Sequence, residues 1–195
     1  MVRPFVDRYL DEVAEIARTI DRDALTALVS GLAAVRARGG RLFMLGIGGS
    51  AANASHAVND FRKIGGIETY APTDNVAELT ARTNDDGFET VFARWLETSR
   101  LDADDAVFVL SVGGGSDTTS RNLVAAMEYA RRVGAKVLSV VSRDGGAARG
   151  LSDVCVLVPV VEPTRITPHA EEWQAVVGHL VVNALCPPEA GGGAP

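Results

Sequence analysis

The sequence is poor in cysteine and histidine and carries no excess of positive charge. Two of its 195 residues are cysteine, three are histidine, and the formal net charge is −6. Cys155 and Cys186 lie far apart and without the spacing of metal ligands, so we expect a reduced, buried thiol at Cys155 in a reducing cytosol. An acidic chain also lacks the basic face with which proteins coat nucleic acid.

Long apolar runs are missing as well. No stretch approaches the roughly 20 apolar residues that a membrane-spanning helix needs. The first residues, MVRPFVDRYLDEV, have acidic side chains where a signal peptide would have its apolar core. We therefore expect a soluble cytoplasmic protein whose partners include neither nucleic acid nor a membrane.

What the chain does contain is the composition of a globular domain. Hydrophobic residues make up 47% of the sequence and charged residues 23%. This length suits one domain, which we place over residues 1–186. The last segment, 187–195, has no apolar side chains to pack and is predicted to be disordered.

Apolar periodicity predicts two helices before any strand. Apolar residues recur at helical spacing from Val2 to Ile20, and a second such pattern begins near Asp21 and ends at the glycines of RGG. Short Val- and Leu-rich runs follow at 41–46, 105–111, 135–142 and 153–161, with a weaker one at 66–72. Such runs are typical of strands buried on both faces of a parallel sheet.

Helical patterns separate these strands, at 50–63, 74–99, 119–133 and 145–151, and a long helix near the C-terminus begins with Thr167 as its N-cap. Alternating strands and helices indicate an α/β protein with a doubly wound, five-stranded parallel sheet flanked by helices. Ligands of such sheets bind at the carboxyl ends of the strands.

Two glycine-rich turns follow predicted strands and enter helices: Gly46-Ile47-Gly48-Gly49-Ser50 and the segment 111–120, SVGGGSDTTS. Glycine lets the backbone approach a ligand closely, and helix N-terminal amides with nearby hydroxyls bind anions. Two hydroxyl-rich turns in one small sheet favour a phosphate site. A dinucleotide is the alternative, because Gly46, Gly48 and Ala51 match G-x-G-x-x-A and Glu68 could bind a ribose. No P-loop motif occurs, and a purely structural role for the turns stays open.

Further motifs make the resemblance to a known family specific. The segment GIGGSAANASH, the sequence N-D-x-G-F from Asn84 to Phe88, and a histidine in the last helix resemble the phosphoheptose isomerases. These are sedoheptulose 7-phosphate isomerases with the sugar isomerase (SIS) fold, and the resemblance covers roughly residues 1–185.

Acid and base side chains form two pairs by their spacing. His56 and Asp60 are four residues apart and share a helix face. Glu171 and His179 are eight apart on the last helix, about 80° from each other in direction. In most proteins, either pair alone would be a charge pair on the surface. His169 matches no role in the family and is interpreted as an ordinary residue in the first turn of its helix.

The resemblance assigns roles to these residues. It implies that Asp60 is the base of an enediol isomerisation and His179 a general acid or metal ligand. It also implies a zinc ion held by His56, Asp60, Glu171 and His179. The substrate contacts that it implies are Ser50, Asn53, Asp85, Ser111, Ser116, Thr119, Ser120 and Glu171.

Three departures from the family pattern stand out. Asp60 and Glu171 replace a glutamate and a glutamine, so the expected metal site has two carboxylates. An alternative is that Glu171 is a solvated acid in the first turn of its helix. The serine-rich turn is longer than usual and contains Asp117, whose carboxylate would repel a phosphate. Either Asp117 points away from the phosphate, or the register of this loop differs from the one assumed here.

The implied reaction converts D-sedoheptulose 7-phosphate to D-glycero-D-manno-heptose 7-phosphate, the entry to nucleotide-activated heptoses. The resemblance also implies a homotetramer with shared active sites, and the apolar stripe on the first helix favours burial against another subunit. The alternatives are isomerisation of another phosphosugar, a non-catalytic phosphosugar-binding or regulatory protein and, less favoured, an oxidoreductase.

Overall fold

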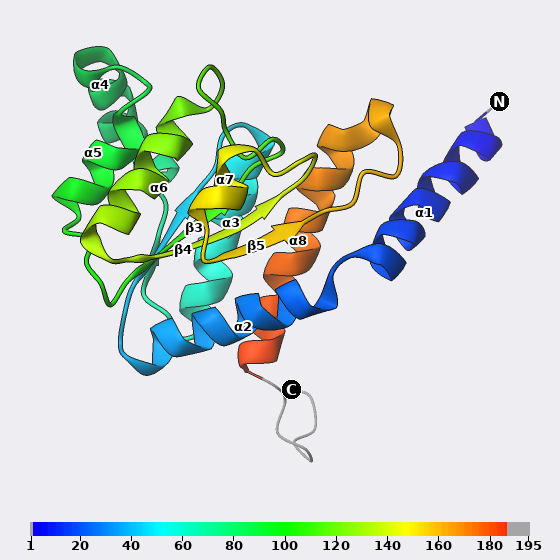
Figure 1. Cartoon of the computed structure of the whole chain (residues 1–195), viewed down its shortest axis with the longest axis horizontal. Helices are drawn as coiled ribbons and strands as arrows, with labels where there is room; N and C mark the ends of the chain where they lie inside the picture. Colours follow the sequence, from blue (N-terminus) through cyan, green and yellow to red (C-terminus); the bar gives the residue numbers. More distant parts are fainter. Residues whose placement is uncertain (1, 187–195) are drawn as a thin grey trace.

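Five parallel strands form one sheet in the order β2-β1-β3-β4-β5 (Figure 1). The computed structural model describes residues 2–186, so the predicted disorder of 187–195 lies outside the described residues. The strands are β1 (Leu42–Leu45), β2 (Thr69–Tyr70), β3 (Ala106–Leu110), β4 (Lys136–Val141) and β5 (Val154–Leu157). The predicted fold class is confirmed.

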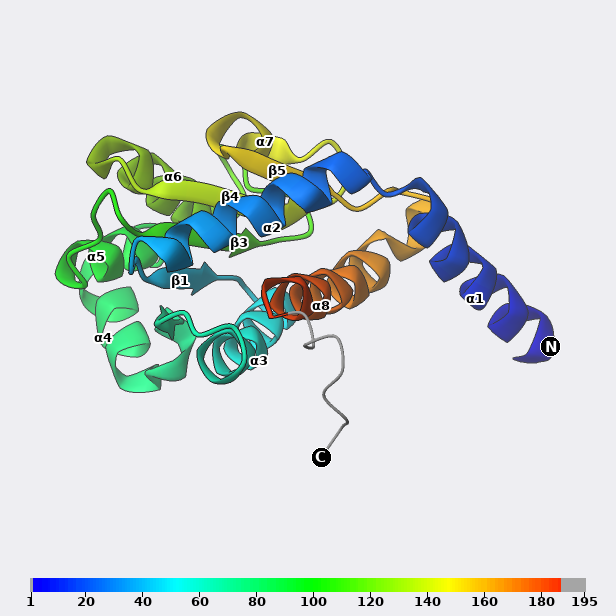
Figure 2. The ribbon, with the colours of Figure 1, turned by 90° about the horizontal axis from the view of Figure 1, so that it is seen from below.

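Helices cover both faces of the sheet and make three layers (Figure 2). The helices are α1 (Val2–Thr19), α2 (Arg22–Ala37), α3 (Gly49–Lys63), α4 (Val76–Asp86), α5 (Val91–Thr98), α6 (Arg121–Val133), α7 (Gly146–Leu151) and α8 (Ile166–Leu185). Helices α2, α3 and α8 pack on one face, and α5, α6 and α7 pack on the other.

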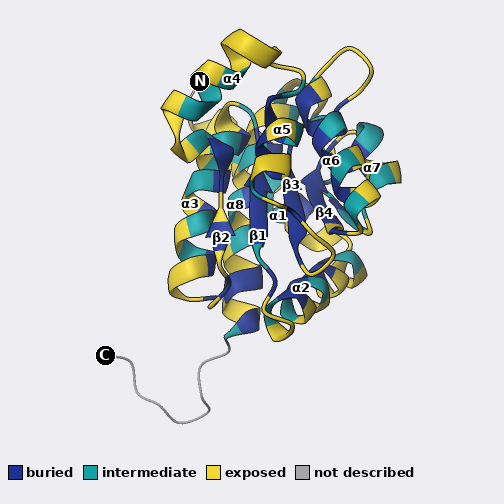
Figure 3. Ribbon diagram, turned by 90° about the vertical axis from the view of Figure 1, so that its left-hand side faces the viewer, coloured by how far each residue is buried: buried dark blue, intermediate teal, exposed yellow. Residues whose placement is uncertain are grey.

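The strand residues explain how both layers are held. Successive side chains of a strand point to opposite faces, so Leu42 and Met44 pack in one core while Phe43 and Leu45 pack in the other. All four are at most 1% exposed. In Figure 3 the sheet is accordingly dark blue between partly yellow helices. Among the described residues no helix combines the length and the apolar character required to cross a membrane.

Three local predictions were wrong in detail. The helix expected over 74–99 is divided into α4 and α5, because Gly87 adopts a φ of 83°, which ends the helix. Helix α8 begins at Ile166 after a short 3₁₀ turn, so Thr167 is its second residue and Arg165 is the N-cap. The last strand ends at Leu157, two residues before Pro159, which has no N–H to donate to a sheet.

Helix α1 extends away from the sheet (Figures 1 and 2). Side chains near its middle attach it to the start of α8. Arg165 donates to both oxygens of Glu12, at 2.8 and 2.5 Å. His169 is 3% exposed, and its two ring nitrogens lie 2.9 Å from Glu12 and 3.2 Å from Glu172. The hydrogen bonds from Arg165, and then from His169, lower the pKa of Glu12 to about 2. His169 is therefore the buried member of a partly exposed hydrogen-bond network that its sequence context does not reveal.

This network predicts a loss of stability in acid. Because the pKa of Glu12 falls from 4.5 to about 2 on folding, its contribution is complete above its ordinary pKa and disappears as the pH falls toward 2. We expect Glu12→Gln to lower the melting temperature at neutral pH, and the difference from the unmodified chain to shrink as the solution is acidified. Circular dichroism melts across this pH range measure it.

Glu15→Gln is the matched control, because Glu15 also lies on α1 but forms only an exposed pair with Arg18. Equal melting temperatures of the Glu12 and Glu15 variants at neutral pH would contradict the role of the network.

Candidate functional site

The strand order brings the two glycine-rich turns together. Strands β1 and β3 are neighbours in register from Leu42 and Ala106 onward, and the chain leaves them toward opposite edges of the sheet. The carboxyl ends of strands at such a switch in order are where doubly wound folds bind ligands. One turn follows β1, and the serine loop, which we define as residues 111–120, follows β3.

The first turn sets the backbone at the N-terminus of α3. Gly48 is the N-cap residue, with a φ of 62° that side chains rarely adopt, and no side chain caps the helix there. The first amides of α3 are therefore left for an external acceptor. Ser50 follows in the first turn and is buried.

The serine loop and this turn enclose a pocket of about 440 Å³, which we call the hydroxyl pocket. All five hydroxyl residues predicted to contact a phosphate line it: Ser50, Ser111, Ser116, Thr119 and Ser120. The loop is braced internally, because Ser111 Oγ accepts from Gly114 N–H at 3.1 Å and Ser116 Oγ accepts from Thr119 N–H at 3.1 Å. Asp117 is fully exposed and lies 3.6 Å from Arg121, and it does not line the pocket.

A dinucleotide at this turn is disfavoured by the position of Glu68. The acidic residue that binds a ribose stands at the carboxyl end of the second strand. Glu68 instead precedes β2, and its backbone carbonyl accepts from Leu42 N–H at the start of β1. Glu68 therefore lies at the amino ends of the strands, whereas the glycine turn lies at their carboxyl ends.

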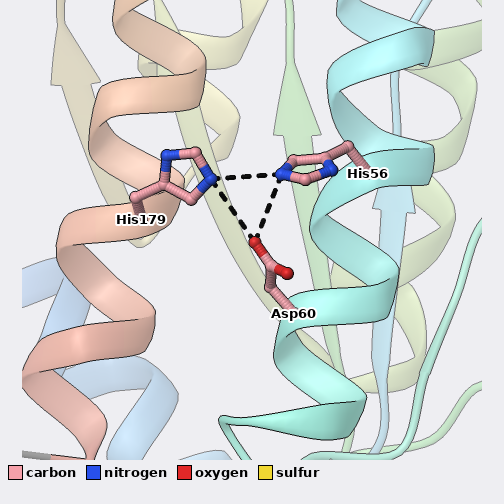
Figure 4. A group of neighbouring side chains, drawn as sticks. All are labelled: His56, Asp60 and His179. Carbon is pink, nitrogen blue, oxygen red and sulfur yellow. Dashed lines mark hydrogen bonds and ion pairs between the residues drawn. The ribbon is translucent and has the colours of Figure 1, made fainter. Parts of the chain in front are cut away.

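A second cluster lies where α3 packs against α8 (Figure 4). His56 Nε2 is 3.1 Å from His179 Nε2, and Asp60 Oδ2 is 3.3 Å from His56 and 3.4 Å from His179. Both imidazoles are more than half exposed, whereas the Asp60 side chain is 14% exposed. The predicted i, i+4 pair on α3 and the late histidine thus meet in one place.

These three atoms have the spacing of metal ligands. Atoms bound to zinc at about 2.0–2.2 Å in a tetrahedron lie roughly 3.3–3.6 Å apart. The observed separations of 3.1–3.4 Å are close to those values. Among the described residues, His56, Asp60 and His179 are the group of His and acidic side chains compact enough to hold an ion. Two imidazoles and one carboxylate fit a zinc site that keeps a position open.

Glu171 is not brought into this group. Its carboxylate lies against Gly49, where an added Cβ would be 2.5 Å away, at the start of α3. Eight residues correspond to about 12 Å of rise along α8, so a residue so far from His179 need not share its surroundings. Three of the four predicted metal ligands therefore lie together, and Glu171 stands apart.

The other two predicted sugar contacts are placed differently. Asn53 lines a small pocket beside the His56–Asp60–His179 cluster, but its amide donates to Glu171 O at 2.8 Å and to Gln174 Oε1 at 3.1 Å. Asp85 is exposed on α4, where Asn84 donates to it, and it lines neither this pocket nor the hydroxyl pocket.

Two polar residues at these pockets were not predicted. Gln174 is 2% exposed, lines the small pocket, and its Nε2 has no hydrogen-bond partner within residues 2–186. Its spacing of three from Glu171 is a signal for a shared helix face. Arg143 lines the hydroxyl pocket from the turn after β4. Its position just past a predicted strand could have indicated it.

Comparison with known proteins accounts for this combination. Residues 8–142 match the SIS domain family. The chain is 31% identical to the phosphoheptose isomerase of Chlorobium phaeobacteroides, over 88% of this chain and 77% of that protein. It belongs to the phosphoheptose isomerase family of SIS domain proteins. The phosphoheptose isomerase of Akkermansia muciniphila is 35% identical, over 75% of this chain and 76% of that protein.

A solved structure of the family matches the fold of nearly the whole chain. A solved structure of phosphoheptose isomerase from Neisseria gonorrhoeae superposes with a TM-score of 0.81, covering 95% of this chain and 98% of that one, at 24% identity. At this identity the likeness shows the shared fold alone. The resemblance seen in the glycine turn, the N-D-x-G-F segment and the late histidine is thus confirmed as family membership.

Proposed function

We propose that this phosphoheptose isomerase family member converts D-sedoheptulose 7-phosphate to D-glycero-D-manno-heptose 7-phosphate through an enediol, the entry step to nucleotide-activated heptoses. The observation that carries the proposal is the pairing of two sites along α3. The helix starts at the hydroxyl pocket with Ser50 and carries His56 and Asp60 further along. Relatives named phosphoheptose isomerase support the choice of substrate over other phosphosugars.

The phosphate group belongs in the hydroxyl pocket. Hydroxyls of the serine loop and the free amides at the start of α3 donate hydrogen bonds to its oxygens. Along a helix, His56 and Asp60 stand about 9 and 15 Å beyond Ser50. A sugar phosphate held at one end can therefore present its distant carbons toward the side chains of α3.

The isomerisation moves two protons and leaves the carbon chain intact. One proton passes from C1 to C2 and another from the C1 hydroxyl to the C2 oxygen. We assign the transfer between carbons to Asp60, whose carboxylate is the one in the cluster, and the transfer between oxygens to His179. Their joint presence favours catalysis over a purely regulatory role.

We further propose that His56, His179 and Asp60 Oδ2 hold a zinc ion. When bound there, the ion would act as a Lewis acid toward the substrate oxygens. Asp60 Oδ1 points away from the imidazoles and accepts from Asn59 at 3.0 Å, so this carboxylate has a second oxygen for proton transfer. Glu171 keeps its proposed place among the substrate contacts, beside Gly49 at the start of α3. Location in the cytoplasm stays a prediction from the sequence.

A homotetramer is the proposed assembly. Helix α1 exposes Val2, Phe5, Val6 and Leu10, and α8 exposes Val176 and Leu180 next to His179. Exposed apolar side chains gathered on α1 and α8 favour burial of these helices against other copies of the chain. Burial of those on α8 would bring a second subunit close to His56, Asp60 and His179.

The Asp60→Asn variant tests the reaction. Because an amide cannot accept a proton from carbon, we expect the turnover of sedoheptulose 7-phosphate to fall by about 10²–10⁴-fold. An NMR assay of substrate and product measures it, with Lys63→Ala, at an exposed position at the end of α3, as the control. Inactivity of the unmodified chain on this sugar would refute the proposed substrate, and full activity of Asp60→Asn would refute the assigned base.

Metal content tests the zinc proposal. We expect purified protein to contain about one zinc per chain, and His56→Ala to lose most of it, since two remaining ligands bind the ion far less well. Elemental analysis measures this directly. Glu171→Gln is the comparison variant, and because its carboxylate lies apart from the cluster it should retain the metal. A fully active metal-free enzyme would contradict the proposal.

The assembly is tested by mass in solution. We expect sedimentation equilibrium to give four times the chain mass of 20.5 kDa. Leu10→Glu places a charge in the exposed apolar stripe of α1 and should shift the protein to smaller species. Lys63→Glu on α3 serves as a control for added negative charge. A monomeric unmodified chain would overturn the tetramer.

A further inference from the structure

The hydroxyl pocket contains one positively charged side chain. Its lining within residues 2–186 consists of hydroxyl, glycine and apolar residues together with Arg143 and Asp144. Asp144 is already engaged, because its carboxylate accepts from Gly146 N–H at 3.1 Å. A phosphate in this pocket would therefore meet many neutral donors, the carboxylate of Asp144 and a single cation, Arg143.

The backbone holds Arg143 firmly at the pocket. It occupies the second position of a four-residue turn that is closed by Gly145 N–H donating to Ser142 O at 3.0 Å. Ala147 and Ala148 N–H then donate to Gly115 and Gly114 of the serine loop, at 2.8 and 3.0 Å. The turn after β4 and the serine loop thus form one hydrogen-bonded unit.

Close contact between the two segments requires glycine. A Cβ on Gly114 would lie 2.0 Å from the carbonyl oxygen of Gly145. The position of Arg143 relative to the serine loop is therefore set by main-chain packing and does not depend on its own side chain.

The guanidinium itself lies over the serine loop. Its Nη1 is 3.9 Å from the place of a Cβ on Gly113, in the middle of the loop. Within the described part of the chain, Arg143 makes no ion pair or hydrogen bond through its side chain, while Arg165, Arg41 and most other arginines do. Arg143 also has a φ of 55°, a conformation in which glycine or asparagine is usual.

We propose that Arg143 binds the phosphate of the substrate and supplies the positive charge that the serine loop lacks. This inference rests on the proposed phosphosugar substrate and adds the residue that recognises its charge. Guanidinium donates two parallel hydrogen bonds to phosphate oxygens, a geometry that a single hydroxyl cannot supply. In a chain with a net charge of −6, this local cation also offsets the repulsion of an anionic substrate.

Arg143→Asn removes the charge and suits the backbone, since asparagine tolerates a positive φ. We expect its KM for sedoheptulose 7-phosphate to rise about tenfold, as for loss of a hydrogen bond between charged groups, with kcat changing less than KM. Arg143→Lys should recover part of the affinity. The rise of KM with added salt should be weaker in Arg143→Asn than in the unmodified chain, which a merely structural role would not alter.

Arg100→Asn is the matched control. Arg100 is also an exposed arginine with a positive φ, of 54°. It precedes β3, however, and so lies toward the amino ends of the strands, away from the hydroxyl pocket. Its KM should equal that of the unmodified chain. Arg143→Gly provides a second uncharged variant that fits the same backbone, should the asparagine variant fold poorly.

Direct binding of inorganic phosphate and of sedoheptulose 7-phosphate, measured by ³¹P NMR titration, separates this proposal from the proposed reaction. If the unmodified chain is inactive but its phosphate binding weakens in the two uncharged variants, Arg143→Asn and Arg143→Gly, the result supports the role of Arg143 and refutes the proposed reaction. Unchanged binding and KM in both variants overturn the role of Arg143, whatever the activity. Equal weakening in Arg100→Asn would overturn it as well.

Discussion

The packing of α3 against α8 is the contact on which the catalytic proposal depends. Asn53 on α3 donates to the backbone carbonyl of Glu171 and to Gln174 Oε1 on α8, which joins the start of α3 to the first half of α8. Because a carbonyl oxygen only accepts, this arrangement also fixes which atom of each amide faces the other. The small residues Ala57, Ala175 and Gly178 line the space between the helices and leave room for the histidines. A change that separated α3 from α8 would separate His56 and Asp60 from His179.

The sheet sets the second constraint by placing the hydroxyl pocket at one end of α3. Strand β1 lies between β2 and β3, so the turn after β1 and the serine loop meet at the switch in strand order. In the proposed mechanism one helix carries both functions: its first turn receives the phosphate, and its later turns carry His56 and Asp60. Substrate binding and proton transfer are thus coupled by the rigidity of α3.

Much of the fold could be predicted because it follows from local patterns. Continuous apolar strands, amphipathic helices and glycine turns depend on neighbours in the sequence, so the α/β class, the five strands and the hydroxyl residues of the serine loop were all accessible. The pairing of His56 with Asp60 was accessible for the same reason, since four residues are about one helical turn. The break at Gly87 and the start of α8 were not predicted. Helix ends depend on the backbone angles of single residues, and the same residue types also occur inside helices and loops.

The sequence by itself determined the class of fold, the residue types of the hydroxyl pocket and the family. The tertiary structure decided which of these residues meet. It joined His179 to His56 and Asp60 across 123 positions of chain, set Glu171 against Gly49 instead, engaged Asn53 in helix packing, and brought Arg143 to the serine loop. These outcomes depend on strand order, helix packing and side-chain direction, which are properties of contacts between distant segments and have no counterpart in local spacing.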